Sequence, residues 1–156
     1  MIHLRIAVVG SAGSGKSALI ERLVGDDTHT YQYNDSLVKV FQGPRGPCYV
    51  HFREFKYENK ADYSSIDALL IVADVNDDQD MALALSLAKG WKTCTTKPVS
   101  VVANKTDMTN TRRRHQIIQN INVHYLSCKS NFSHAPLKRI LKAYNIQAFV
   151  ESVIYE

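Results

Sequence analysis

Apolar residues along the chain fall into short runs of two kinds, separated by polar segments rich in glycine, proline, asparagine and aspartate. Uninterrupted, β-branched runs are typical of strands buried in a parallel sheet, whereas apolar residues that recur every three or four positions indicate amphipathic helices. The first kind predicts strands at 4–9, 37–41, 48–55, 68–75, 99–103 and 124–126. The second kind predicts helices at 18–24 (continuing from Lys16), 81–91, 109–122 and 136–144.

The order of these elements predicts an α/β fold with a doubly wound sheet, because strands that alternate with helices pair in parallel. The Gly- and Pro-rich segment 42–47 is an exception, since it predicts a hairpin and therefore one antiparallel pair. We expect a single domain over 1–156 with a six-stranded, mostly parallel sheet and one antiparallel edge strand. Its core spans about 4–144, and apolar residues at helical spacing predict a helical extension over 145–156.

The amino-acid composition sets only broad limits on the class of protein. Hydrophobic residues make up 45% of the chain and charged residues 22%, which is typical of globular proteins. No apolar run of about 18 residues predicts a membrane-spanning helix, and no secretory leader is apparent, so we expect a cytoplasmic protein. The three cysteines have neither disulfide-framework nor zinc-ligand spacing. The net charge of +4 is densest at Arg112, Arg113 and Arg114, which we interpret as the solvated face of the helix predicted at 109–122.

The segment 10–17 reads Gly-Ser-Ala-Gly-Ser-Gly-Lys-Ser and fits the phosphate-loop pattern G-x-x-x-x-G-K-[ST] between a predicted strand and a predicted helix. Its glycines let successive backbone N–H groups converge on phosphate oxygens, and the positive end of the helix dipole reinforces them. Lys16 is expected to stabilise the β- and γ-phosphates, and Ser17 to bind Mg²⁺. The residues predicted to contact the nucleotide here are Gly10, Ala12, Gly13, Ser14, Gly15, Lys16, Ser17 and Ala18.

A second motif, Asn-Lys-Thr-Asp at 104–107, follows the strand predicted at 99–103. With the phosphate loop upstream, the chain resembles the Ras superfamily of small GTPases, which implies a P-loop NTPase G domain. The resemblance implies that Asp107 accepts hydrogen bonds from guanine, that Lys105 covers the base, and that Asn104 ties the motif to the phosphate loop. A buried carboxylate left unpaired rejects adenine. The later segment Ser127-Cys128-Lys129 is similar to the family's base-contact turn, with Cys128 offering its backbone N–H to guanine.

The switch elements of that family are poorly preserved. Glu54 stands where the family has a magnesium-linked aspartate, Tyr57 replaces its glycine, and Glu58 occupies the position of the water-orienting glutamine. The longer Glu54 side chain would displace a water near the metal, Tyr57 would hinder backbone approach to the γ-phosphate, and Glu58 would repel it. Ser36 is the candidate metal-binding hydroxyl of the first switch, with Thr28 and Thr30 as alternatives. Misalignment of this region is a further alternative.

These observations predict a protein that binds GTP or GDP with Mg²⁺ and hydrolyses GTP slowly if at all. The alternative is a pseudo-GTPase module that binds nucleotide without switching. A nucleotide kinase that shares only the phosphate loop is disfavoured by Asn104 to Asp107. We expect protein effectors or scaffold partners, no nucleic acid and no covalent membrane anchor.

Overall fold

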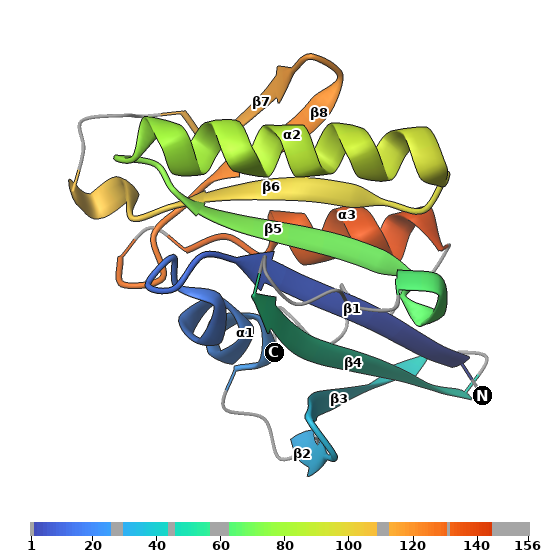
Figure 1. Cartoon of the computed structure of the whole chain (residues 1–156). Coiled ribbons are helices and arrows are strands. Elements are labelled where there is room, and N and C mark those ends of the chain that lie inside the picture. Colours follow the sequence, from blue (N-terminus) through green and yellow to red (C-terminus); the bar gives the residue numbers. More distant parts are fainter. Residues whose placement is uncertain are drawn as a thin grey trace.

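A sheet with helices on both faces forms the centre of the computed structural model (Figure 1), which describes residues 2–25, 30–43, 46–56, 63–108, 113–130 and 132–144. In these ranges the sheet has eight strands in the order β2-β3-β4-β1-β5-β6-β8-β7. The strands are β1 (Ile2–Gly10), β2 (Thr30–Tyr33), β3 (Ser36–Gly43), β4 (Gly46–Lys56), β5 (Ala68–Asp74), β6 (Val99–Asn104), β7 (His115–Ile118) and β8 (Ile121–Tyr125). The helices are α1 (Lys16–Val24), α2 (Asp78–Cys94) and α3 (Ala135–Ala143), with 3-10 turns η1 (Tyr63–Ser65) and η2 (Thr106–Met108).

The sheet is mostly parallel, as the sequence predicts. Strand β1 lies between β4 and β5 and pairs in parallel with both, and β6 continues the parallel part to β8. Strands β3 and β4 form the predicted antiparallel hairpin. The predicted count of six strands is wrong, because β2 and β7 add two antiparallel members at the two edges.

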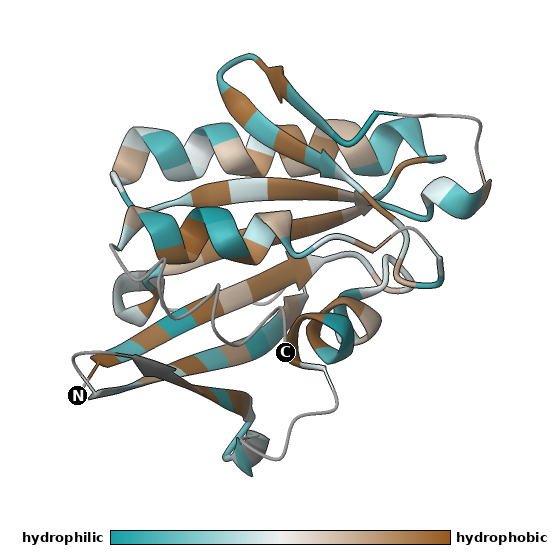
Figure 2. Cartoon of the chain, turned by 180° about the vertical axis from the view of Figure 1, so that it is seen from behind, coloured by the Kyte–Doolittle hydropathy of each residue, from teal (hydrophilic) through white to brown (hydrophobic). Residues whose placement is uncertain are grey.

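The helix predicted over 109–122 is a second departure. The described part of this segment is the β7–β8 hairpin, which rises beyond α2 in Figures 1 and 2. Gln119 and Asn120 form its two-residue turn with φ values of 50° and 68°. Positive φ at both positions characterises the turn whose twist suits a tight hairpin, and asparagine tolerates that conformation. The β-branched isoleucines on either side of this turn therefore pair across strands instead of forming a helical stripe.

Two hydrophobic clusters hold the layers together. Alternate residues of β1, such as Ile6 and Val8, pack with α1 and α3 on one face of the sheet. Their neighbours Ala7 and Val9 belong to the cluster under α2 on the other face. Figure 2 shows the hydrophobic residues concentrated along the central strands. Because α1 and α2 cover opposite faces, the chain reverses its winding between β1 and β5, and the carboxyl ends of these strands border the crevice where such sheets bind ligands.

Helix α2 begins with the side-chain cap that its sequence predicts. The Asp77 carboxylate accepts hydrogen bonds from the backbone N–H groups of Gln79 and Asp80 at 3.0 and 3.1 Å. The helical extension predicted over 145–156 lies outside the described residues. Among the residues that are described, no helix is both long and apolar enough to cross a bilayer.

One buried histidine makes stability depend on pH. His124 of β8 is 2% exposed, and within the described structure neither ring nitrogen has a hydrogen-bond partner. Burial, together with the positive charge of His115 and Arg139, lowers the pKa of His124 to about 4. The unfolded chain therefore binds this proton near pH 6.5 and the folded chain only near pH 4, so stability is lost as the pH falls through this interval.

We expect the free energy of unfolding to decrease by about 2 kcal/mol between pH 7 and pH 5 through this group. Urea denaturation at a series of pH values measures the decrease, with His124→Leu as the comparison because it removes the titrating ring. The variant should be less sensitive to pH over this interval. Parallel pH profiles for the two proteins would contradict the assignment.

Candidate functional site

The phosphate loop connects the end of β1 to the first turn of α1. Gly13 and Gly15 have φ values of 80° and 103°, a conformation that favours glycine. Among the described residues no side chain caps α1, so the N–H groups of its first turn point out of the helix without a capping acceptor. A Cβ at Gly13 would meet nothing within 4 Å, whereas one at Gly15 would collide with the Asn104 amide. The loop therefore has free space beside Gly13 and is tightly packed at Gly15. This arrangement suits a loop that binds an anion with its backbone N–H groups.

Lys16 folds back across this loop. Its ammonium group donates hydrogen bonds to the carbonyl oxygens of Gly10 and Ser11, both at 2.9 Å. These contacts fix the charge beside the N-terminus of α1, where the helix dipole also favours an anion. Ala12 is exposed, and Ser14 is buried with a side-chain oxygen that lacks a partner in the described structure.

Asn104 joins the two sequence motifs. It is 3% exposed at the end of β6, and its amide nitrogen donates to the Ser14 carbonyl oxygen at 3.0 Å. Its side-chain oxygen accepts from the backbone N–H of Cys128 at 3.3 Å. One buried side chain thus connects the phosphate loop to the segment 127–129, and the two parts of the site have a fixed separation.

Asp107 and Ser127 form the contact that orients the second motif. The Ser127 hydroxyl donates to one oxygen of the exposed Asp107 carboxylate at 2.7 Å. The same hydroxyl oxygen accepts from the backbone N–H groups of Lys129 and Ser130 at 3.1 and 3.3 Å. Asp107 has no other hydrogen bond in the described part of the chain, so its second oxygen can accept from a ligand.

Lys105 is held beside this carboxylate in a left-handed conformation, with φ of 68°. Its ammonium group lies 3.2 Å from the Asp74 carboxylate at the end of β5. Burial alone would raise the pKa of Asp74, but hydrogen bonds from the Asn76 backbone and from Lys105 outweigh it and lower that pKa. The ion pair thus ties the Lys105 side chain to the end of β5.

Asp80 is a contributor that sequence reasoning missed. It is 8% exposed in the first turn of α2, and its carboxylate accepts from the Ser11 hydroxyl at 3.0 Å and from the Asp74 backbone N–H at 2.8 Å. Asp80 therefore links the phosphate loop to the end of β5 through these two hydrogen bonds. An acidic residue in the first turn of a helix is ordinarily explained by the helix dipole, so the sequence carries no signal for this second role.

Comparison with known proteins agrees with this arrangement. No protein-family model matches the chain. The chain is similar to Mitochondrial Rho GTPase 1 of Mycosarcoma maydis, with 27% identity over 121 residues. The matched stretch makes up 70% of this chain and 16% of that protein, so the chain spans a small part of the length of its curated relative.

The similarity supports a small GTP-binding protein. The mixed α/β architecture, with a mostly parallel sheet and helices on both faces, is compatible with a G domain.

Glu54 lies next to the hydroxyl of Ser17, the metal-binding residue predicted from the sequence. Strand β4 is paired with β1 in parallel, and Glu54 lies opposite Val8 near the phosphate loop. The Ser17 hydroxyl is 2.9 Å from each Glu54 carboxylate oxygen. The additional methylene of glutamate, compared with aspartate, thus brings the carboxylate into direct contact with Ser17. A carboxylate and a hydroxyl are donors that suit Mg²⁺.

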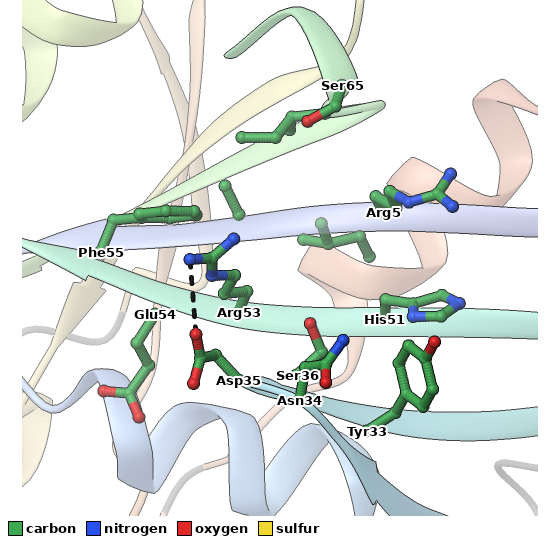
Figure 3. Close-up of a pocket in the computed structure, with 13 residues that line it drawn as sticks. Arg5, Tyr33, Asn34, Asp35, Ser36, His51, Arg53, Glu54, Phe55 and Ser65 are labelled. Atoms are coloured by element: carbon green, nitrogen blue, oxygen red, sulfur yellow. Dashed lines mark ion pairs between the residues drawn. The ribbon is translucent and has the colours of Figure 1, made fainter. Parts of the chain in front are cut away.

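The predicted first switch lies near β4, beside a cavity that Glu54 also borders. Ser36 and the β2–β3 turn line an open cavity of about 1070 Å³, together with the outward-facing residues of β4 (Figure 3). Arg53 lies 3.6 Å from Asp35 there, and both side chains are at least half exposed, so the pair adds little stability. Within the described structure no hydrogen bond links Ser36 to Ser17 or Glu54. Ser36 and Glu54 thus line the same cavity without contacting each other through a hydrogen bond.

Of the other switch residues predicted from the sequence, Thr30 lies within the described residues. Thr30 begins β2, and its buried hydroxyl has no partner among the described residues. Thr28, Tyr57 and Glu58 lie outside the described residues. In the ranges that are described, no group of three or more His, Cys, Asp or Glu side chains is placed to hold a metal ion. A magnesium site here would therefore depend on Ser17, Glu54 and the phosphates of the nucleotide.

Proposed function

We propose that this chain binds GTP and GDP with Mg²⁺ and hydrolyses GTP slowly. The observation that carries the proposal is the pair of hydrogen bonds made by Asn104, which join the phosphate loop to the Ser127–Lys129 turn. Lys16 and the first turn of α1 would hold the phosphates, while Asp107, Lys105 and the Cys128 N–H would hold guanine. Guanine fits this position because its N1–H and exocyclic amine can both donate to a carboxylate, whereas adenine has no such donor pair.

The magnesium ion would be held by Ser17, with Glu54 beside it. It would neutralise charge on the β- and γ-phosphates. The chain's own residues fit this role, because the Ser17 hydroxyl and the Glu54 carboxylate are already in contact at 2.9 Å. The same contact places a negative charge close to the phosphate loop, so Glu54 also raises the electrostatic cost of binding nucleotide without a cation.

Slow hydrolysis follows from what surrounds the terminal phosphate. The sequence has Tyr57 and Glu58 at the positions where the family that this chain resembles has glycine and glutamine. A carboxylate at the second position cannot approach a triphosphate without like-charge repulsion, and Ser36 is not joined to the metal-binding pair. We expect protein partners to distinguish the GTP-bound from the GDP-bound chain. No residue described above identifies these partners.

A second function is favoured by the direct Glu54 contact. If the carboxylate keeps Ser17 engaged when nucleotide is bound, the chain is a pseudo-GTPase module that binds guanine nucleotide as a structural ligand and does not switch. The Glu54→Asp variant distinguishes the slow GTPase from the pseudo-GTPase module, because the shorter aspartate side chain is expected to lose its contact with Ser17. An increase in the magnesium dependence of GDP binding in this variant supports the module.

Phosphate release from GTP under single-turnover conditions tests the hydrolysis rate. We expect a rate well below the roughly 4 × 10⁻⁴ s⁻¹ of an unassisted small GTPase, because the water-orienting group is missing. Lys16→Ala, which should bind nucleotide about 100-fold more weakly, provides the background at nucleotide concentrations that load only the unsubstituted protein. A separate binding measurement shows that the unsubstituted protein was loaded. A rate equal to or above that of an ordinary small GTPase would contradict the proposed roles of Glu54, Tyr57 and Glu58.

A further inference from the structure

The basic residues of this protein are concentrated in one part of its sequence. Between positions 108 and 150 there is no aspartate or glutamate, although the chain has 15 acidic residues in total. The same stretch contains seven of the 19 basic residues, namely Arg112, Arg113, Arg114, Lys129, Lys138, Arg139 and Lys142. The rest of the chain therefore has more acidic than basic residues, and this stretch carries the whole positive excess.

The fold places part of this stretch at an edge of the sheet. Strand β7 is the last in the strand order, so within the described ranges only one of its sides is paired. In an antiparallel ladder alternate residues direct their N–H and C=O groups to the partner strand. The Arg114 carbonyl accepts from the Tyr125 N–H at 3.0 Å. Gln116 and Ile118 therefore also face β8, while the backbone groups of His115 and Ile117 face outward.

The side chains along this edge combine charge with one apolar group. Ile117 is 63% exposed, and His115 is exposed two residues away on the same face. Arg114 is exposed at the start of the same edge. An Arg139 guanidinium nitrogen of α3 lies 3.5 Å from the His115 ring, on the same face of the sheet as Ile117. No carboxylate from β7, β8 or α3 neutralises these cations, since none of the three contains an acidic residue. The β7 edge, defined by Arg114, His115, Ile117 and Arg139, is thus positively charged around an exposed aliphatic side chain.

We propose that the β7 edge binds an acidic, extended segment of a partner protein as an added strand. The outward N–H and C=O groups of His115 and Ile117 supply the main-chain hydrogen bonds of such an addition. Arg114 and Arg139 supply charge complementarity to the carboxylates of the partner. Because residues two positions apart share a face of a strand, and Arg139 lies on the same face as Ile117, the segment has an acidic residue and an apolar residue two positions apart.

Two other occupants fit this edge less well. A second copy of the chain would bring the same arginines together, and like charges disfavour a symmetric β7–β7 pair. A single-stranded nucleic acid needs exposed aromatic faces for its bases. The ring of His115 lies against the His124 ring, with centroids 4.9 Å apart, and the hydroxyl of the half-buried Tyr125 donates to Gln116 at 2.9 Å. The other side chain exposed between the arginines is the aliphatic Ile117.

Hydrogen exchange of the full chain with a short peptide that repeats Glu-Thr-Val-Thr, which places glutamate and valine on the same face of an added strand, tests the proposal. The peptide should slow exchange at the His115 and Ile117 amides, which face outward. Arg114→Glu and Arg139→Glu should each weaken peptide binding about tenfold. Lys89→Glu, an equal charge reversal at an exposed position of α2, should leave the affinity unchanged. Both arginines are exposed, so these reversals are expected to preserve the fold.

Three results would overturn the proposal. The first is equal binding of a peptide in which proline replaces valine, because proline cannot complete the strand. The second is unchanged exchange at His115 and Ile117 when the peptide is bound. The third is stronger protection of these amides by an oligouridine than by the acidic peptide, which would assign the edge to RNA.

Discussion

Replacing Lys16 with alanine should weaken the binding of GTP, GDP and ATP alike, by about 100-fold. The ammonium group is held by the Gly10 and Ser11 carbonyl oxygens at 2.9 Å, directly beside the N-terminus of α1. The proposed contact is with phosphate oxygens, which all three nucleotides share, so the loss does not depend on the base. Isothermal titration calorimetry with each nucleotide in the presence of magnesium measures the effect.

The matched control for this variant is Lys89→Ala, which removes an exposed lysine from α2. It should bind nucleotide as the unsubstituted protein does. Unaltered GTP affinity in Lys16→Ala, with the fold intact by circular dichroism, would show that the loop does not hold phosphate through this side chain.

Replacing Asp107 with asparagine should weaken GTP and GDP binding by about 100-fold to 1,000-fold and leave the weaker binding of ATP almost unchanged. The substitution preserves shape, and the amide oxygen can still accept from the Ser127 hydroxyl, which donates to Asp107 at 2.7 Å. However, the amide presents donors to a guanine edge that itself donates. The charge-assisted hydrogen bonds are lost, and the discrimination between guanine and adenine decreases with them.

Competition between labelled GDP and unlabelled nucleotides measures this discrimination. Asp78→Asn is the control, because Asp78 is an exposed aspartate in the first turn of α2 and lies outside the proposed base site. If Asp107→Asn retains the guanine preference of the unsubstituted protein, the carboxylate does not recognise the base.

Much of this fold could be predicted from sequence because its signals are local. The apolar runs that form β1, β5 and β6 are nearly continuous, and strands buried on both faces require such runs. The phosphate loop and the Asn104 motif occupy fixed positions relative to those strands, so their approximate placement follows from the strand order. The Asp77 cap was similarly predictable, since it depends on residues within one turn of the helix.

The β7–β8 hairpin shows where the same reasoning failed. Ile117, Ile118 and Ile121 are spaced as on a helix face, yet the Gln119-Asn120 turn has two residues with positive φ. A two-residue turn with asparagine between β-branched residues was the available signal, and it was outweighed by periodicity. The error mattered for function, because a helix would have hidden the backbone edge that β7 exposes.

The contacts of the site could not be predicted beyond the motifs themselves. Asp80 reaches Ser11 across 69 positions of sequence, and Glu54 reaches Ser17 across 37 positions. Each pair depends on the register between strands and on helix placement, which no local pattern specifies. The alignment that placed Glu54 near the metal was one interpretation of the sequence, and it stays a prediction. The structure places the Glu54 carboxylate 2.9 Å from the Ser17 hydroxyl.

The binding of GTP, GDP and ATP to the unsubstituted protein with magnesium, compared by calorimetry under identical conditions, tests the central claim most directly. We predict binding of both guanine nucleotides and an affinity for ATP at least about 100-fold weaker, because only guanine can donate twice to Asp107. Equal affinity for ATP, or no heat with any of the three nucleotides, would contradict the claim that Asn104 and Asp107 join a base site to the phosphate loop.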